Sequence, residues 1–179
     1  VAGDVGTYKL IYGERVADKE ISLTFADVYK LHAVYESTAI GDAAAAPTLT
    51  TVGATGTFTV GETITGDQTA ATGTVLSVAG STLTYVKVTG IFSTLDTISG
   101  ATSGFNATLS ASTAGSKNIT SDFLLDTGQR DSYYDLGRIV RKSNAQSPIG
   151  QLLIVYDYCT HGSGDYFSVD SYTGQIDYD

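Results

Sequence analysis

Apolar and polar positions alternate along much of the chain, in short runs separated by Gly, Ser, Asp and Pro. In residues 7–12, Tyr and Leu side chains alternate with Thr and Lys, and residues 31–35 repeat this period of two. A period of two is typical of a half-buried strand. No long segment has the helical spacing of apolar residues, so the sequence predicts an all-β fold.

Further strands are predicted at residues 123–125, 138–141, 152–158 and 166–169, which are rich in apolar and β-branched side chains. The segment 152–158 is the most apolar, and we expect it to be the central strand.

Two short helical turns are also predicted. Thr24, with Asp27 three residues later, resembles a capping box that would begin one turn at residues 24–28. A second turn is predicted within residues 131–136.

The composition changes in the middle of the chain. Residues 44–115 are rich in Thr, Gly, Ala and Ser, whereas residues 1–43 and 116–179 hold nearly all the charge. We interpret the middle as a β domain inserted into a discontinuous β-sandwich-like host domain, whose strands on either side of the insertion pair in one sheet. The charged residues of the insertion are Glu62, Asp67, Lys87 and Asp96.

An internal repeat lies within the insertion. Residues 56–66 align with residues 90–100 at an offset of 34 residues, so that Phe58 matches Phe92 and Ile64 matches Ile98. The match continues to about residues 77 and 110, and each copy is predicted to be a strand, a Gly turn and a strand. Two copies are too few for a solenoid. They predict a small β-barrel or sandwich with pseudo-twofold symmetry, with Gly80-Ser81 as a hairpin turn.

The charge balance restricts the partners. The net charge is −9, the pI is about 4.4, and only 16% of residues are charged. Nucleic-acid affinity depends on Lys and Arg neutralising phosphates, and an anionic membrane surface also attracts basic residues. We therefore expect neither nucleic acid nor membrane as a partner.

Cys159 is the single cysteine, so the chain forms no internal disulfide, and we expect this side chain to be buried. The chain contains no Met, even at position 1, which indicates a fragment or a cleaved product. No apolar run approaches the roughly 18 residues of a transmembrane helix.

The densest polar cluster is at residues 126–135, with Asp126, Gly128, Gln129, Arg130, Asp131 and Asp135. Paired carboxylates can act as acid and base when one pKa is raised. An adjacent Arg instead favours the ionised form. We therefore predict a structural turn, with Gly128 at positive φ and Arg130 bridging carboxylates or carbonyls, and no catalytic residue.

Metal and cofactor sites are not predicted. Asp157, Asp165 and Asp170 offer calcium-type ligands but lack the spacing of a calcium loop. His32 and His161 have no companion at ligand spacing, and each is expected to be a packed or surface side chain.

Tyrosines are abundant in the C-terminal region. Tyr is favoured in cross-strand packing and at protein interfaces, and it also stacks on sugars. We favour packing and interface use over glycan binding. The predicted structural or interface residues are Gly128, Arg130, Asp131, Tyr134, Tyr156, Tyr158 and Tyr166.

Several segments resemble a known family. Residues 126–142, 150–158 and 165–172, with residues 31–37 upstream, are similar to a module of the large virion structural proteins of tailed phages, above all cyanobacterial myoviruses. The Gly-Glu-Thr-Ile-Thr-Gly segment at 61–66 is similar to small β modules of phage tail and fibre proteins. The resemblance implies a structural part of a baseplate, neck, tail or fibre.

These observations favour a non-enzymatic virion component that forms homo-oligomers or binds neighbouring virion proteins. Two alternatives stay open. One is an extracellular filament or adhesin subunit, in which residues 7–12 would complete a neighbour's sheet. The other is a module that recognises host glycan through the loops of the insertion. A hydrolase that uses Asp131 or Asp135 is a more distant alternative.

Overall fold

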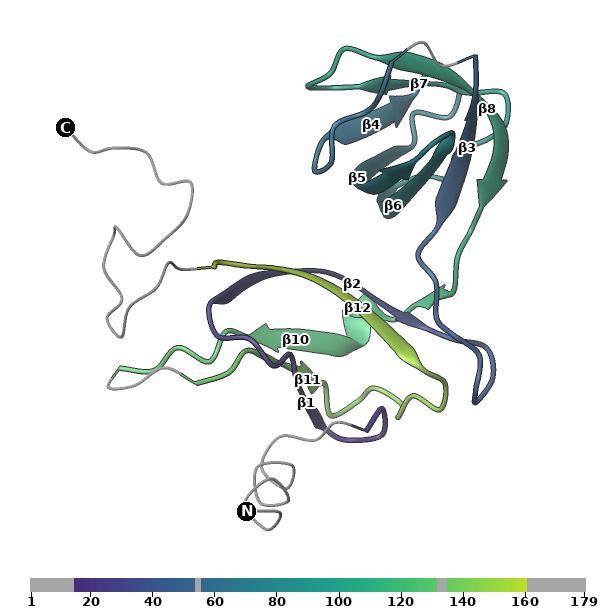
Figure 1. The fold of residues 1–179 in the computed structure, drawn as a ribbon. Coiled ribbons are helices and arrows are strands. Elements are labelled where there is room, and N and C mark those ends of the chain that lie inside the picture. The colour runs from purple at the N-terminus through teal and green to yellow at the C-terminus, as the bar shows by residue number, and fades with distance from the viewer. Residues whose placement is uncertain (1–14, 54–55, 132–134, 161–179) are drawn as a thin grey trace, which may run out of the picture. The chain divides into compact units, whose positions relative to one another are not determined.

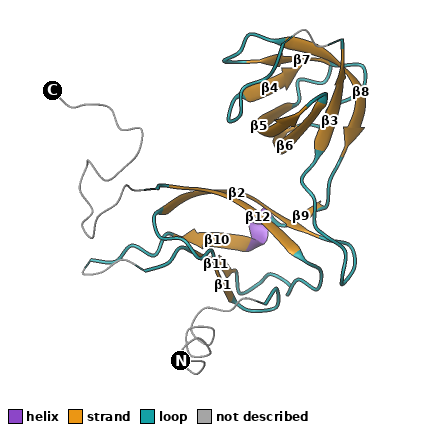
Figure 2. Ribbon diagram, in the orientation of Figure 1, coloured by secondary structure: helices purple, strands orange, loops and turns teal. Residues whose placement is uncertain are grey.

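The computed structural model describes residues 15–53, 56–131 and 135–160 (Figure 1). The fold is all-β, as predicted, and a single 3-10 turn at Thr120–Asp122 is the helical element of the described part (Figure 2). The chain forms two compact units. Unit 1 contains the described residues up to Val34, Ile119–Ile149 and the residues from Ile154 onward, and unit 2 contains Tyr35–Asn118 and Gly150–Leu153.

Unit 2 contains a closed six-stranded barrel in the order β3-β6-β5-β4-β7-β8. This confirms the predicted small barrel. Gly80, at a φ of 60°, lies in the tight turn between β5 and β6, as predicted. The strands are β3 (Thr48–Val52), β4 (Thr63–Gly66), β5 (Thr72–Ala79), β6 (Thr82–Thr89), β7 (Thr97–Gly100) and β8 (Asn106–Thr113).

The strand registers of the barrel show its twofold symmetry. The β3–β6 pairing is centred on Leu49 opposite Leu83, and the β4–β7 pairing is centred on Thr65 opposite Ser99. Both pairs of residues are 34 positions apart in the sequence. Two equivalent residues that face each other in an antiparallel pair lie on a local twofold axis. The axis therefore passes between Leu49 and Leu83 inside the barrel and between Thr65 and Ser99 on its surface.

The repeat is longer than the sequence pattern predicted. Each copy has three strands, β3 to β5 or β6 to β8, rather than two. We name residues 48–79 copy 1 and residues 82–113 copy 2. The sequence carries the missing signal, because Thr-Leu-Thr at 48–50 recurs at 82–84.

The barrel interior is filled by apolar side chains that alternate with exposed Thr and Ser along the strands. The largest fully buried members come in equivalent pairs, because Ile64 and Ile98 are both 0% exposed. The buried core contains Leu49, Phe58, Ile64, Ala71, Val75, Leu83, Tyr85, Phe92, Ile98, Ala107 and Leu109.

Two three-stranded sheets complete the described fold. One has the order β1-β11-β10 and the other the order β12-β2-β9. Strands from both sides of the barrel segment pair in each sheet, as predicted, but they form two sheets instead of one. The strands are β1 (Glu20–Ser22), β11 (Arg138–Arg141), β10 (Phe123–Asp126), β12 (Leu152–Tyr158), β2 (Val28–Glu36) and β9 (Lys117–Asn118).

Unit 1 buries an apolar core supplied by both sheets. Ala33 and Val34 of β2 and Ile139 of β11 are 0% exposed. Phe123 at the start of β10 and Ile119 just before it are also buried. The predicted strands at 123–125, 138–141 and 152–158 are confirmed as β10, β11 and β12.

Three predictions were wrong, and the first concerns the single cysteine. Cys159 is exposed instead of buried, because it follows the last residue of β12. Among the described strands, β12 lies at the end of its sheet and β2 in the middle, although β12 is the more apolar. Residues 24–27 are not helical, because Thr24 and Asp27 have φ values of 65° and 55°. The Thr24 hydroxyl donates to the Leu23 carbonyl instead of capping a helix. The predicted strands at 7–12 and 166–169 and most of the predicted turn at 131–136 lie outside the described residues.

Candidate functional site

An ion cluster of Asp126, Arg130, Arg138, Glu20 and Asp135 lies in unit 1. Asp126 ends β10 and lies opposite Arg138 of β11 in the strand register. The Arg130 guanidinium donates to both Asp126 carboxylate oxygens at 3.0 and 2.8 Å, and Arg138 donates to Oδ2 at 2.7 Å. Two guanidinium groups therefore share one carboxylate, a geometry that suits the planar fork of Arg.

The electrostatics of this cluster follow from its contacts. The hydrogen bonds from Arg130 hold the pKa of Asp126 well below its usual value, against the effect of burial, and the Gly128 N–H and Arg138 add to the shift. Arg138 also lies 3.4 Å from Glu20 and 3.5 Å from Asp135, and its contact with Glu20 is an ion pair without hydrogen-bond alignment. The cluster connects β1, β10, β11 and the loop between the last two.

Gly128 is required by this loop. Its φ is 78°, and a Cβ at this position would collide with the backbone carbonyls of Asp135 and Leu136. The Asp135 N–H donates to the Gly128 carbonyl at 2.9 Å, which closes the loop. The expected positive φ at Gly128 and the bridging role of Arg130 are thus both found.

The other predicted residues are distributed differently. Asp131 is exposed and is not part of the ion cluster, and Tyr134 and Tyr166 lie outside the described residues. Sequence reasoning missed Arg138 and Glu20, which come from β11 and β1. Only the strand pairing brings them to Asp126, so no spacing in the sequence could identify them.

An aromatic surface formed by Phe25, Tyr156 and Tyr158 lies where β12 ends, whereas Tyr29 of β2 lies beside Asp157. The rings of Phe25 and Tyr158 are stacked at 4.2 Å, and the Tyr156 hydroxyl donates to the Leu23 carbonyl at 3.0 Å. Tyr29 is 59% exposed, Phe25 43% and Tyr158 39%. Tyr156 thus has a packing role, while the stacked rings of Phe25 and Tyr158 are presented at the surface of this part of the structure.

His32 of β2 and Asp157 of β12 form a pair beside the aromatic surface. The His32 Nε2 lies 2.6 Å from Asp157 Oδ2, and the histidine side chain is 11% exposed. The negative charge of Asp157 also raises the pKa of Tyr29 above its ordinary value. Of the other residues considered as metal ligands, Asp165, Asp170 and His161 lie outside the described residues. Within the described ranges, no group of three acidic, His or Cys side chains is placed to hold a metal ion.

In the barrel, the buried carboxylates are Glu62 and Asp96, which occupy equivalent positions of the two copies. The Glu62 carboxylate accepts hydrogen bonds from the backbone N–H groups of Thr102 and Ser103 at 3.0 and 2.9 Å. It also accepts from the Ser103 hydroxyl and from the N–H of Thr59. Glu62 of copy 1 therefore holds the turn that follows β7 in copy 2.

Asp96 makes the equivalent contacts in the opposite direction. Its carboxylate accepts from the N–H groups of Gln68 and Thr69 at 2.9 and 2.8 Å and from the Thr69 hydroxyl. It also accepts from the N–H of Ser93, the equivalent of Thr59. Asp96 of copy 2 thus holds the turn that follows β4 in copy 1.

Both carboxylates remain ionised because of these bonds. Burial by itself would raise the pKa of Glu62 and of Asp96, but the donors from Ser103, Thr59 and Thr102, and from Ser93, Thr69 and Gln68, outweigh it. The pKa of each is lowered from its ordinary value. These acids have their acceptor positions occupied and act as structural anchors of the barrel.

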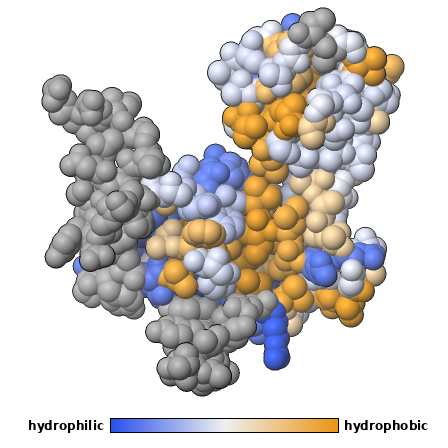
Figure 3. Space-filling model, in the orientation of Figure 1, coloured by the Kyte–Doolittle hydropathy of each residue, from blue (hydrophilic) through white to orange (hydrophobic). Residues whose placement is uncertain are grey.

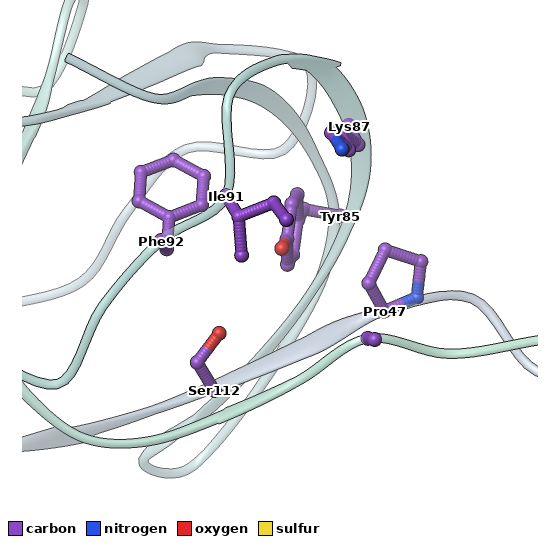
Figure 4. Close-up of a pocket in the computed structure, with 7 residues that line it drawn as sticks. Pro47, Tyr85, Lys87, Ile91, Phe92 and Ser112 are labelled. Atoms are coloured by element: carbon purple, nitrogen blue, oxygen red, sulfur yellow. The ribbon is translucent and has the colours of Figure 1, made fainter. Parts of the chain in front are cut away.

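A pocket of about 190 Å³ opens in unit 2, and Figure 4 shows the side chains around it. The ring of Phe92 meets Tyr85 edge-on at 5.3 Å, and burial raises the pKa of Tyr85 despite a hydrogen bond with Ser112. Apolar atoms make up most of the wall, with the Ser112 hydroxyl and the exposed Lys87 as polar groups. The lining residues are Pro47, Tyr85, Lys87, Ile91, Phe92, Ser112 and Ala114.

The surface around the barrel is weakly polar. Figure 3 shows the barrel largely in pale colours, which correspond to its many Thr, Ser and Gly residues, with hydrophobic patches between them. Exposed apolar side chains of this unit include Val60, Ile91 and Leu95, at 62%, 71% and 80%. In the described part of the chain, no helix is long and apolar enough to cross a membrane.

Comparison with family models, with curated proteins and with solved structures finds no match to this chain.

Proposed function

We propose that this chain is a non-enzymatic structural component of a phage virion, which acts by assembling with copies of itself or with neighbouring virion proteins. The segment 126–142, which carries most of the resemblance to virion modules, begins at the last residue of β10 and contains all of β11. Its polar residues are used to fix the pairing of these two strands: Asp126 is bound by Arg130 and Arg138. This is the arrangement of a scaffold.

The observation that carries the proposal is the state of the carboxylates. Asp126 in unit 1 and Glu62 and Asp96 in the barrel are each surrounded by donors and have a lowered pKa. A general acid or base needs a pKa near the working pH and a free position toward a substrate. These three side chains have the opposite properties, and they stabilise strands and turns instead.

The aromatic surface of unit 1 supports assembly. Tyr and Phe are enriched at the cores of protein interfaces, because they bury a large area with little loss of side-chain entropy. The stacked rings of Phe25 and Tyr158 are presented together at the end of β12. We propose that a second copy of the chain or a neighbouring virion protein packs on these rings.

The glycan-binding alternative is less well supported by the barrel. Sugars stack on exposed aromatic faces, but Phe58, Tyr85 and Phe92 are only 5%, 3% and 3% exposed. Phe105 is partly buried against Phe58, with ring centroids 5.1 Å apart. The aromatic side chains of the insertion therefore belong to its core. The filament alternative rests on residues 7–12, which lie outside the described residues.

Immunogold electron microscopy with an antibody to this chain tests the proposal on tailed particles from the source material. Label at one substructure of the particles is the expected result, and it would also identify the substructure. Label along non-viral filaments, or particles without label, would overturn the proposal and favour the filament alternative. A particle preparation from a phage that does not encode the chain provides the control.

A further inference from the structure

We infer that the three-strand repeat is a self-recognising assembly unit, whose partner is a second copy of the same repeat. In this chain the partner is fused in sequence, so that the barrel is a covalent dimer of copy 1 and copy 2. A copy that lacks its fused partner is expected to build the same barrel with a copy on another chain. This inference depends on the barrel alone and does not rest on the virion proposal.

The first support is the pairing across the twofold axis. The first strands of the copies, β3 and β6, pair with each other, and so do the middle strands, β4 and β7. Both registers are centred on equivalent residues. The edge of a strand in one copy therefore pairs with the same edge of the equivalent strand in the other copy. This is the geometry of an isologous interface, in which the same surface occurs on both partners.

The second support is the exchange of carboxylates. Glu62 reaches the N–H groups of Thr102 and Ser103, and Asp96 reaches those of Gln68 and Thr69. Each acid thus leaves its own copy to bind the other. A copy without a partner would leave both its carboxylate and its post-strand turn without these bonds, which is costly for buried groups.

Backbone contacts follow the same exchange. The Asp67 N–H donates to the Thr97 carbonyl, and the equivalent Ala101 N–H donates to the Thr63 carbonyl. A Cβ on Gly56 would collide with Phe105, and a Cβ on Gly90 would collide with Ala71, which is the equivalent of Phe105. The two copies therefore use equivalent glycines to accept each other's backbone and side chains.

The aromatic residues show how the copies differ. Phe58 meets the ring of Phe105 from the other copy, whereas Phe92 meets Tyr85 from its own copy. The equivalents of Phe105 and Tyr85 are the small residues Ala71 and Thr51. Each core Phe thus has one aromatic neighbour, which comes from the other copy for Phe58 and from the same copy for Phe92. A barrel made of two identical copies needs an aromatic side chain at position 71 to keep this packing.

The connection between the copies is short. Copy 1 ends at Ala79 and copy 2 begins at Thr82, with only Gly80 and Ser81 between them. The turn adds two hydrogen bonds, from the Thr51 N–H and hydroxyl to the Ser81 carbonyl. The strand pairs and carboxylate bonds between the copies lie outside the turn. The fusion should therefore act mainly by raising the effective concentration of the partner.

A full-length duplicate chain tests self-recognition. In it, residues 82–113 are replaced by the sequence of residues 48–79, so that both copies have the sequence of copy 1. Position 71 and its equivalent, position 105, are both Phe in this chain. We expect a folded barrel whose amide NMR signals merge into nearly one set for both copies. The matched control lacks Phe at 71 and 105 and should fold less stably, because each core Phe then loses its aromatic neighbour. A duplicate chain without dispersed barrel signals would overturn the inference.

A single-copy chain tests recognition between chains. Here residues 82–113 are replaced by a flexible Gly/Ser linker, and Ala71→Phe is again included. We expect light scattering to give twice the monomer mass, with barrel signals that depend on concentration. Adding Glu62→Gln should weaken this dimer by at least about tenfold, because both cross-copy carboxylates are lost. A mass that stays monomeric, with no binding of a synthetic copy 2 peptide, would overturn the partner assignment even if the duplicate chain folds.

Discussion

The barrel and the two-sheet unit hold their strands together in different ways. In the barrel, the polar anchors Glu62 and Asp96 are equivalent residues that bind backbone N–H groups in a symmetric exchange. In unit 1, the anchor is a group of unlike side chains, in which Asp126 binds the guanidinium groups of Arg130 and Arg138. The barrel is therefore fixed by a repeated pattern, and unit 1 by a single ionic centre.

This difference has consequences for stability. Bonds from a buried carboxylate to backbone N–H groups depend on the turn geometry and are shielded from salt by burial. Ion pairs at partly exposed side chains, such as the 25% and 32% exposed pair Asp126 and Arg130, are weaker and more sensitive to salt. Substitutions should therefore affect each unit separately, and the barrel more strongly.

The largest effect is expected for Asp96→Ala. Asp96 is 1% exposed and its removal leaves the N–H groups of Gln68, Thr69 and Ser93 without their acceptor. We expect a loss of about 3 kcal/mol in the free energy of unfolding of the barrel. Glu62→Ala should lose a similar amount, since its contacts are equivalent. Urea unfolding followed by NMR measures this. Asp42→Ala, at an exposed position of the same unit, is the control, and an equal loss there would contradict the assignment.

A smaller effect is expected for Gly66→Ala. A Cβ at this position would lie 2.7 Å from Cγ of Asp96, so the carboxylate must shift from its donors. Overpacking of this kind costs about 2 kcal/mol. Gly100→Ala should lose at least as much, because its Cβ would lie 2.6 Å from Oε2 of Glu62 and would also collide with the Ser103 hydroxyl. Thermal unfolding of both variants, with Thr63→Ala on the exposed face of β4 as control, tests the symmetry. A loss at only one of the two glycines would contradict it.

In unit 1, Asp126→Asn should cost about 2 kcal/mol. The substitution keeps the size of the side chain but removes the charge that binds Arg130 and Arg138. The loss should appear in the unfolding of unit 1 and leave the barrel signals unchanged, and it should shrink in high salt. Asp131→Asn, at an exposed position, should change stability by less than about 0.5 kcal/mol. Equal losses for both variants would remove the special role of Asp126.

The stability of the barrel should change little with pH near neutrality and should decrease clearly in acid. The folded pKa values of Glu62 and Asp96 lie below their ordinary values of 4.5 and 3.8. The stabilisation from these groups is thus complete above the ordinary values and is lost as the pH falls through the lowered ones. Urea midpoints of the barrel should decrease as the pH is lowered below about 4. The Glu62→Gln, Asp96→Asn variant should lack most of this decrease, and an unchanged decrease would contradict the assignment.

The barrel could be predicted from the sequence because an internal repeat identifies strands that are equivalent although they are far apart in the chain. Ile64 and Ile98 match at a fixed offset, so their strands were expected to be equivalent, and the barrel confirms this. The first strand of each copy was not recognised as part of the repeat, because Thr-Leu-Thr at 48–50 is short and lies in a Thr-rich segment. The positive φ of Gly128 could be predicted from the local sequence, since a turn after a strand often needs a residue at positive φ.

The remaining features depend on non-local pairing that no spacing reveals. Arg138 and Glu20 are 118 positions apart and meet only because β1 and β11 pair. Likewise His32 meets Asp157 only because β2 and β12 are neighbours. The apolar character of β12 suggested a central strand, but β12 lies at the end of its sheet and its side chains are only partly buried. The local pattern at Thr24 and Asp27 was overridden by left-handed backbone at both residues.

Amide hydrogen exchange is the most direct test of the account, because it reports which copy each carboxylate holds. In Glu62→Gln, the account predicts that the amides of Thr102 and Ser103 in copy 2 lose protection, while those of Gln68 and Thr69 keep it. Asp96→Asn should show the reverse. Loss of protection confined to the copy that carries the substitution, in both variants, would contradict the exchange of carboxylates on which the self-recognising barrel rests.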